Sequence, residues 1–158
     1  MLAGNYKRSY EAFGKALELH PNWVWGYIKK AYSHIFLKEF DKALPLAEKA
    51  KLLMKDGWGS ELLQTTLIFI YKNCGCNEEA DKLIDRFEKY AAENTPEDPF
   101  SVAFLYYMKG DYKKTCEWEE KTLADRSPSA YLFNLPIFYD LEFYQSDQHQ
   151  KILRKMGF

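Results

Sequence analysis

Three cysteines are the first candidates for chemistry in this sequence, because a thiolate is both a nucleophile and a metal ligand. Cys74 and Cys76 are separated by a single glycine, a spacing too tight for an easy disulfide. The sequence has no second cysteine pair at zinc-finger spacing, and an odd number of cysteines does not match an extracellular disulfide framework. We therefore expect Cys74, Cys76 and Cys116 to be reduced thiols, with no metal site.

Histidines and paired carboxylates are the other groups that could act as acid and base, but their spacing is unfavourable. His20, His34 and His149 lie far apart, with the first expected in a solvated turn and the second packed inside a helix pair. Glu119 and Glu120 are neighbours on a helix, so their side chains diverge. The sequence contains no glycine-rich phosphate loop, no His-Glu-x-x-His and no Gly-x-Ser-x-Gly. We predict that the chain is not an enzyme and binds no cofactor.

The composition is that of an ordinary globular domain of 158 residues, with 47% hydrophobic and 28% charged residues. A net charge of −1 argues against direct nucleic-acid binding. The aromatic fraction of 17% is high, and rings packed between helices are its simplest use. The sequence has neither an apolar run long enough to cross a membrane nor an N-terminal signal, which predicts a cytoplasmic chain with no membrane contact.

A pattern of small and aromatic residues recurs along the chain and predicts the elements that position these side chains. Its period of about 34 residues is typical of a helix–turn–helix solenoid. The last copy is the weakest, because polar residues replace apolar ones. The four copies are Tyr6, Ser9, Phe13 and Ala16, then Phe40, Ala43, Ala47 and Ala50, then Ala80, Ile84 and Phe87, and finally Thr115, Glu119 and Thr122.

Turn and cap residues set the expected helix bounds. Asp98 is a candidate N-cap with Pro99 in the first helical position, and Ser146 is a candidate N-cap for the last helix, which Gly157 ends. Short aromatic turns are expected over residues 130–144. The predicted helices span residues 5–19, 23–37, 40–54, 99–108, 112–124 and 147–155, with a further pair within 58–92 that turns at Gly75.

These elements predict an all-α fold, a right-handed α-α superhelix of about three and a half repeats with a C-terminal capping helix. Repeats occupy residues 1–128, divided into 4–21, 22–57, 58–94 and 95–128, and an aromatic turn segment with the capping helix occupies 129–158. The half repeat 4–21 lacks its first helix, so Tyr10, Phe13 and Leu17 would meet no partner on one side. We therefore expect a piece of a longer protein, with a homodimer through this half repeat as one way to cover it.

Residues 4–124 resemble the tetratricopeptide repeat, whose motif places a large residue, a Leu-Gly-like pair and an aromatic residue at regular spacing. Lys30 and Gln64 depart from the pattern, and the fourth unit lacks the usual alanines. The resemblance implies that the first helix of each unit lines a concave face. The matching positions are Tyr27, Lys30-Ala31 and His34, then Gln64, Leu67-Ile68 and Tyr71, then Pro99, Val102-Ala103 and Tyr106.

The C-terminal part looks like the tail that closes many bacterial tetratricopeptide arrays. Ser146–His149 departs from the Asp-Pro-Arg-Phe of the family. In the family this arm commonly follows a DNA-binding or nucleotide-cyclase domain, so the resemblance implies the arm of a bacterial signalling or transcription regulator. The matching positions are Gly110-Asp111, Glu117-Trp118, Arg126, Pro128, Pro136, Phe138 and residues 152–158.

The repeat period places a partner-binding groove along the predicted concave face. It is aromatic and apolar and suits an apolar helix or extended segment of a protein or peptide partner, with Lys72 alone able to hold a terminal carboxylate. The predicted groove consists of Trp25, Ile28, Tyr32, Ile35, Leu62, Thr65, Phe69, Lys72, Phe100, Phe104 and Tyr107.

Three hypotheses follow from the sequence. The first is a non-enzymatic interaction module, the regulatory or scaffold arm of a larger signalling protein, with an open groove. The second is a structural or dimerising arm, in which the chain's own aromatic C-terminal segment covers the groove. The third is an enzyme that uses Cys74 or Cys76. The residues that could fold back in the second are Tyr131, Phe133, Phe138, Phe143 and Tyr144.

Overall fold

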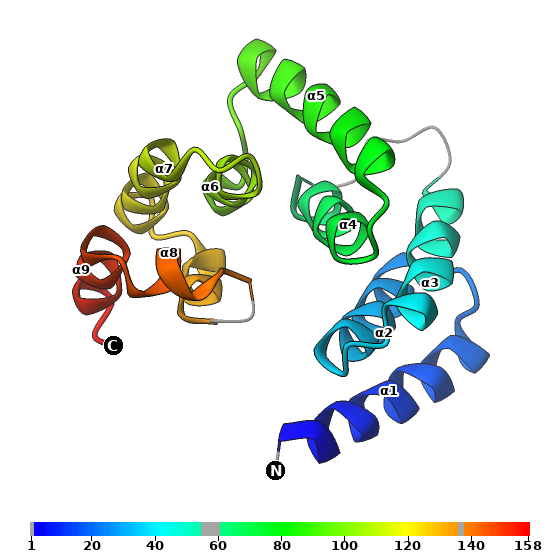
Figure 1. Cartoon of the computed structure of the whole chain (residues 1–158). Helices are drawn as coiled ribbons and strands as arrows, with labels where there is room; N and C mark the ends of the chain where they lie inside the picture. The colour runs from blue at the N-terminus through cyan, green and yellow to red at the C-terminus, as the bar shows by residue number, and fades with distance from the viewer. Residues whose placement is uncertain (1, 55–60, 136–137) are drawn as a thin grey trace. The chain divides into compact units, whose positions relative to one another are not determined.

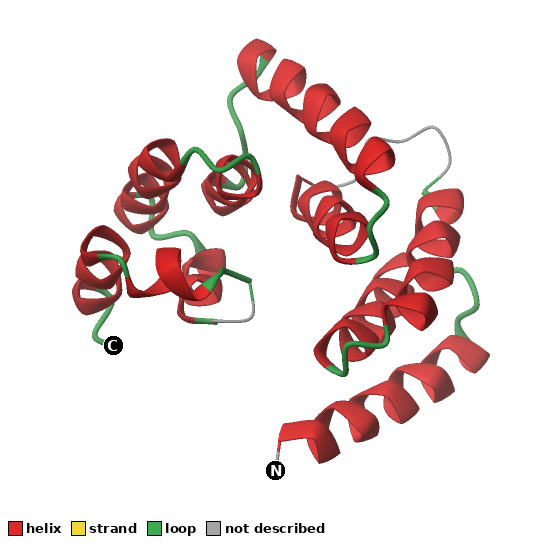
Figure 2. Cartoon of the chain, viewed as in Figure 1, coloured by secondary structure: helices red, strands yellow, loops and turns green. Residues whose placement is uncertain are grey.

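The computed structural model describes residues 2–54, 61–135 and 138–158, with side chains from residue 8 onward. Every regular element in these ranges is a helix, and they contain no strand (Figure 2). The predicted repeat boundary at residue 57, the side chain of Tyr6 and Pro136 lie outside the described residues. The all-helical prediction is confirmed for the part of the chain that the structure describes. The chain divides into two units, the first ending at Arg86 and the second beginning at Phe87.

The first unit is built from helices that pack on their neighbours in the chain (Figure 1). Helix α2 packs against both α1 and α3, and α4 packs against α2 and α3. The predicted bounds agree with the observed ones to within three residues. The helices are α1 (Leu2–Leu19), α2 (Val24–Phe36), α3 (Phe40–Leu53), α4 (Glu61–Asn73) and the first part of α5 (Asn77–Glu93).

Small side chains allow α2 and α3 to approach each other closely. Ala43, Ala47 and Ala50 recur along one face of α3, and all three are completely buried, as is Ala31 of α2. Alanine also has the highest helix propensity, so the same residues favour the helix and its close packing. The alanine pattern thus forms the interface between the two helices.

The apolar side of α1 packs on α2. The rings of Tyr10 and His34 meet edge to face at a centroid distance of 4.6 Å, and those of Phe13 and Trp23 lie 6.3 Å apart. Leu17 is buried. Tyr10 and Phe13 remain half-buried, so α2 covers only part of the face that they form with Leu17. Polar residues dominate the exposed positions of α1, which include Arg8, Glu11, Lys15 and Glu18.

The second unit contains the end of α5 and the C-terminal elements. Helix α6 packs on α7, and η1 and α9 also pack on α7, while α8 packs on α9. Its elements are α6 (Pro99–Met108), α7 (Tyr112–Ala124), the 3-10 helix η1 (Pro128–Asn134), α8 (Leu141–Gln145) and α9 (Asp147–Lys155). The predicted bounds of α6, α7 and α9 are confirmed.

The predicted caps of the second unit differ in detail. Ser146 accepts a hydrogen bond from the backbone N–H of His149 at 3.4 Å, as expected for an N-cap. Asp98 precedes α6 as predicted, but its carboxylate accepts from the hydroxyl of Ser101 at 2.7 Å and makes no backbone cap bond. The Ser101 hydroxyl, at position N3 of α6, therefore occupies the Asp98 oxygen that could otherwise accept from a backbone N–H.

One turn motif ends α2, α4 and α6, and it also ends α7 at Arg126 and α9 at Gly157, so it is a general way of ending helices in this chain. After α2, α4 and α6, a residue with positive φ follows the helix, namely Lys38 (58°), Gly75 (76°) and Gly110 (78°). The next backbone N–H then donates to a carbonyl in the last turn, which is the Schellman arrangement. The accepting carbonyls belong to His34, Tyr71 and Tyr106, at 2.9, 2.9 and 3.0 Å.

Candidate functional site

The predicted groove residues of the first unit divide into buried and half-exposed ones. Ile28, Ile35, Thr65 and Phe69 are buried, so they support the surface and do not form it. Trp25, Tyr32, Leu62 and Lys72 are half-buried and retain area that a partner can contact. Only the residues that are half-buried can serve as direct contacts in this conformation.

Tyr32 of α2 is held in place by α4. Its hydroxyl donates to Oγ1 of Thr66 at 2.9 Å, and its ring lies 6.1 Å from that of Phe69. It also stacks on Phe36, one turn further along α2, at 6.0 Å and an interplanar angle of 12°. A ring fixed by a hydrogen bond and two ring contacts loses little freedom when a partner binds.

Lys29 belongs to the same helix face, although the sequence pattern did not single it out. It lies four residues after Trp25 and three before Tyr32, a spacing that puts all three side chains on one side of α2. Its ammonium is 5.7 Å from the centroid of the Trp25 ring and 5.8 Å from that of Tyr32. Its helical spacing from Trp25 and Tyr32 is the signal in the sequence that places it there.

Lys72 was the one predicted cation of the groove, and its charge already has a partner. Its Nζ lies 3.2 Å from a carboxylate oxygen of Asp81, which belongs to α5. Both side chains are substantially exposed, so the pair is weak and screened by salt. Lys72 is thus a less direct candidate for holding a carboxylate of a partner than Lys29.

The groove residues of the second unit are covered by the C-terminal part of the chain. Phe100 and Phe104 of α6 are each 2% exposed. The ring of Phe100 lies 5.2 Å from Phe133, and that of Phe104 lies 5.5 Å from Phe138 and 6.1 Å from Tyr139. These are the contacts that self-occlusion requires at α6. In this conformation a partner has no access to the two phenylalanine rings.

Asp140 connects the segment that carries Phe138 and Tyr139 to α6 and α7 by hydrogen bonds. One of its carboxylate oxygens accepts hydrogen bonds from the hydroxyls of Tyr107 and Tyr112, at 3.0 and 3.1 Å. The other accepts from the backbone N–H of Phe143 at 2.8 Å, which caps α8. These donors, the Phe143 N–H first, lower the pKa of Asp140. Burial raises the pKa of Tyr107, so its hydroxyl stays protonated and able to donate.

Glu119 and Glu120 have opposite environments, in agreement with the prediction that their side chains diverge. Glu120 is exposed and pairs with Lys155 at 2.7 Å. Glu119 is completely buried, and its Oε2 lies 3.1 Å from Nδ1 of His149, which is buried as well. Burial raises the pKa of Glu119, with the bond to His149 acting against it. The buried pair joins α7 to α9.

A second histidine–glutamate pair occurs in the first unit, at the turn between α2 and α3. Nδ1 of His34 lies 2.7 Å from Glu39, whose carboxylate also accepts from Lys42 at 2.7 Å. His34 is buried as expected, but Glu39 is one-third exposed. The hydrogen bonds from Lys42 and then His34 lower the pKa of Glu39.

The three cysteines are free and half-buried. Burial raises the pKa of Cys74, and it raises that of Cys116 to about 12. A thiol with a raised pKa is a poor nucleophile near neutral pH. The described residues also contain no group of three histidine, cysteine or acidic side chains placed to hold a metal ion.

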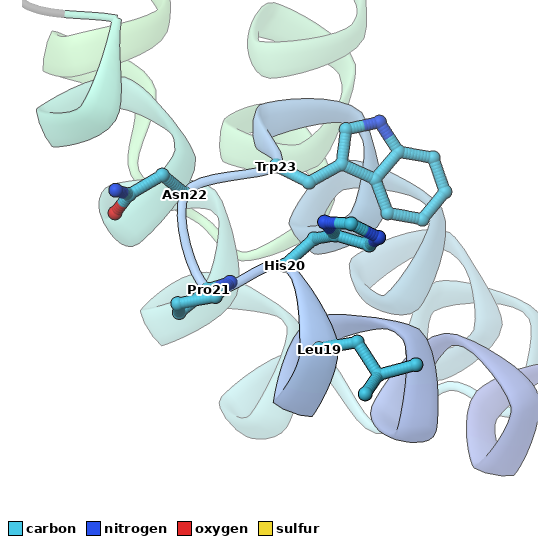
Figure 3. Close-up of a pocket in the computed structure, with 5 residues that line it drawn as sticks. All are labelled: Leu19, His20, Pro21, Asn22 and Trp23. Atoms are coloured by element: carbon cyan, nitrogen blue, oxygen red, sulfur yellow. The ribbon is translucent and has the colours of Figure 1, made fainter.

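A hollow of about 560 Å³ lies at the turn between α1 and α2 (Figure 3). Five consecutive residues, 19–23, line it, and all of them are exposed, including His20 as expected. The turn is fixed by a hydrogen bond from the hydroxyl of Tyr27 to the carbonyl of Pro21 at 3.0 Å. Because no buried polar group faces the hollow, it lacks the convergent groups of a ligand site.

The described residues define the class of the protein as an all-helical chain of packed neighbouring helices. Comparison with protein-family models, with curated proteins and with solved structures gave no match. Among the described helices, none has the length and apolar character of a membrane span. The function is therefore argued from the residues of the chain itself.

Proposed function

We propose that the chain is a non-enzymatic protein-interaction arm built as a tetratricopeptide-like solenoid, and that it binds its partner on the exposed side of α2. The observation that carries the proposal is the half-exposed pair of Trp25 and Tyr32 on one face of α2, with Tyr32 held by Thr66 and Phe69 of α4. Trp and Tyr are the residues most enriched among interface hot spots, each worth roughly 2 kcal/mol or more. The packing of helices on their neighbours in the chain supports the solenoid.

The partner is an apolar helix or extended segment of a protein, since flat rings offer area without a defined set of polar donors. A net charge of −1 supports a protein partner over a nucleic acid. By the resemblance of its C-terminal part, we propose that the arm belongs to a bacterial signalling or transcription-regulatory protein. This placement rests on analogy of sequence pattern.

Selection of short random peptides displayed on phage, with the whole chain immobilised, tests the proposal. We expect peptides rich in apolar residues, and we expect Trp25→Ala to abolish their binding. Trp118→Ala is the matched control, because Trp118 is also half-buried but belongs to α7, outside the predicted groove. Failure to select any peptide, or equal loss with both variants, would count against an interaction surface on α2.

A second candidate function is a structural or dimerising arm, and the covering of Phe100 and Phe104 favours it. If the exposed rings of the first unit serve only to pair two copies, the isolated chain should dimerise at moderate concentration. Sedimentation equilibrium measures this directly. A monomer at high concentration would remove the dimerising arm and leave the interaction arm.

A further inference from the structure

We propose, on the basis of the function proposed above, that the surface formed by Trp25, Lys29 and Tyr32 binds a glutamate or aspartate side chain within an apolar segment of a protein partner. These three residues form the α2 surface. The position of Lys29 on this surface determines the chemistry of the partner that it binds.

No acidic group among the described residues lies within ion-pair distance of Lys29, which is exposed. Other lysines, such as Lys30, Lys51 and Lys121, also have no ion pair among the described residues, so it is the two rings beside Lys29 that set it apart. Burial against its neighbours lowers the pKa of Lys29. A carboxylate brought by a partner would meet this exposed ammonium beside the two rings, and the apolar residues around that carboxylate would exclude water from the ion pair and strengthen it.

The two rings beside Lys29 make this position different from those of other lysines that lie over rings. Lys30 lies over Tyr10, Lys51 over Tyr71 and Lys121 over Trp118, each beside a single ring. Lys29 lies near two half-exposed rings on the same helix face, at 5.7 and 5.8 Å. A partner that reaches the ammonium must therefore also contact apolar ring area.

This combination favours an acidic side chain over a free terminal carboxylate. Recognition of a terminal carboxylate needs several convergent donors, and the α2 surface offers one ammonium between two rings. A glutamate flanked by apolar residues satisfies both parts of the surface at once, with the carboxylate on Lys29 and the apolar neighbours on Trp25 and Tyr32. The acid supplies specificity and the rings supply contact area.

The experiment uses peptides selected on the whole chain, synthesised with an acetylated N-terminus and an amidated C-terminus. Their acidic residue is replaced by the matching amide, and affinity is measured by fluorescence anisotropy. We expect about a tenfold loss on that replacement and about a tenfold loss for Lys29→Met with the unmodified peptide. Lys29→Arg should restore most of the affinity. Lys49→Met, an exposed lysine of α3, should change it by less than about twofold.

The double replacement decides the pairing. With Lys29→Met, the acidic peptide and its amide should bind equally, because the contact is already lost. The proposal is overturned if the Lys29→Met chain still binds the acidic peptide more tightly than its amide. So does binding only by peptides with a free C-terminus, or Lys29-dependent binding of a single-stranded oligonucleotide. If Trp25→Ala abolishes peptide binding but Lys29→Met does not, the interaction arm stands and the acidic partner is wrong. If no peptide binds, both fail.

Discussion

The helix pairs α2–α3 and α6–α7 share one turn motif but treat their aromatic faces differently. On α2, Trp25 and Tyr32 remain half-exposed, and Tyr32 is held by α4. On α6, Phe100 and Phe104 are covered by the rings of Phe133, Phe138 and Tyr139. The aromatic residues predicted for the groove are therefore half-exposed at Trp25 and Tyr32 of α2 but buried at Phe100 and Phe104 of α6.

The second helices of the two pairs differ in a corresponding way. Ala43, Ala47 and Ala50 of α3 are buried against α2, whereas the equivalent positions of α7 hold Thr115, Glu119 and Thr122, which are buried as well. The threonine hydroxyls donate to carbonyls of their own helix, at 2.9 and 2.7 Å. Glu119 instead pairs with His149 of α9. The polar residues of α7 therefore include a partner for the C-terminal helix α9.

The largest effect should come from giving α3 the carboxylate of α7. Ala47→Glu would place a carboxylate at a completely buried position, and we expect a loss of about 4 kcal/mol or more in the free energy of unfolding. Urea denaturation followed by circular dichroism measures it. Lys49→Glu on the exposed side of α3 is the control, expected within about 0.5 kcal/mol. Equal stability of the Ala47→Glu chain would contradict the assigned packing.

Removing one member of the buried pair should have the next largest effect. Glu119→Ala leaves His149 buried without its partner, and we expect a loss of about 3–5 kcal/mol. Replacing both residues by leucine should restore stability or increase it by roughly 1–4 kcal/mol, because two desolvated polar groups disappear together. The exposed pair provides the control, since Glu120→Gln should cost less than about 1 kcal/mol. A double variant as unstable as Glu119→Ala would speak against pairing as the cause.

The two histidine–glutamate pairs should respond to pH in opposite directions. The pKa of Glu39 is lowered, so its contribution is present above the ordinary glutamate pKa and is lost as the pH falls. The pKa of Glu119 is raised, so its contribution is present below that ordinary value and is lost as the pH rises through the raised pKa. The free energy of unfolding of the unmodified chain is compared with that of Glu39→Gln and of Glu119→Gln from acid to neutral pH, which gives the contribution of each glutamate. If the two contributions change with pH in the same direction, the assigned environments are contradicted.

The smallest effect concerns the turns. Lys38 adopts positive φ where α4 and α6 have glycine, and such a conformation costs a non-glycine residue about 1–2 kcal/mol. Because glycine also gains entropy in the unfolded chain, Lys38→Gly should stabilise by no more than about 1 kcal/mol. Gly110→Ala should do the reverse. Thermal denaturation of both variants measures the difference, and a stabilising Gly110→Ala would show that the turn is not under this constraint.

The sequence predicted much of the fold because its signals are local. Small residues at helical spacing, Pro99 at a helix start and Gly75 or Gly110 at helix ends each act within a few residues. The observed bounds of α6, α7 and α9 follow from them. Local signals therefore explain why helix positions were predictable along the chain.

The candidate site was less predictable, because burial depends on contacts between distant residues. Glu119 and His149 are 30 residues apart, and a helix position alone does not show that a carboxylate is buried. One signal was present, since Glu119 falls on the repeat position of Ala47 and Ile84. In the same way, periodicity placed Phe100 and Phe104 on the predicted groove but could not show that Phe133 and Phe138 cover them.

The most direct test of the contrast between the two units is hydroxyl-radical footprinting of the whole chain, read by mass spectrometry. Tyr131, 59% exposed, and Phe133, fully buried, provide an open and a closed reference from the same element. We predict that Trp25 and Tyr32 are oxidised at rates between those of Tyr131 and Phe133, and that Phe100 and Phe104 are oxidised as slowly as Phe133. Oxidation of Phe100 and Phe104 as fast as Tyr32 would contradict it, because the α6 face would then be open.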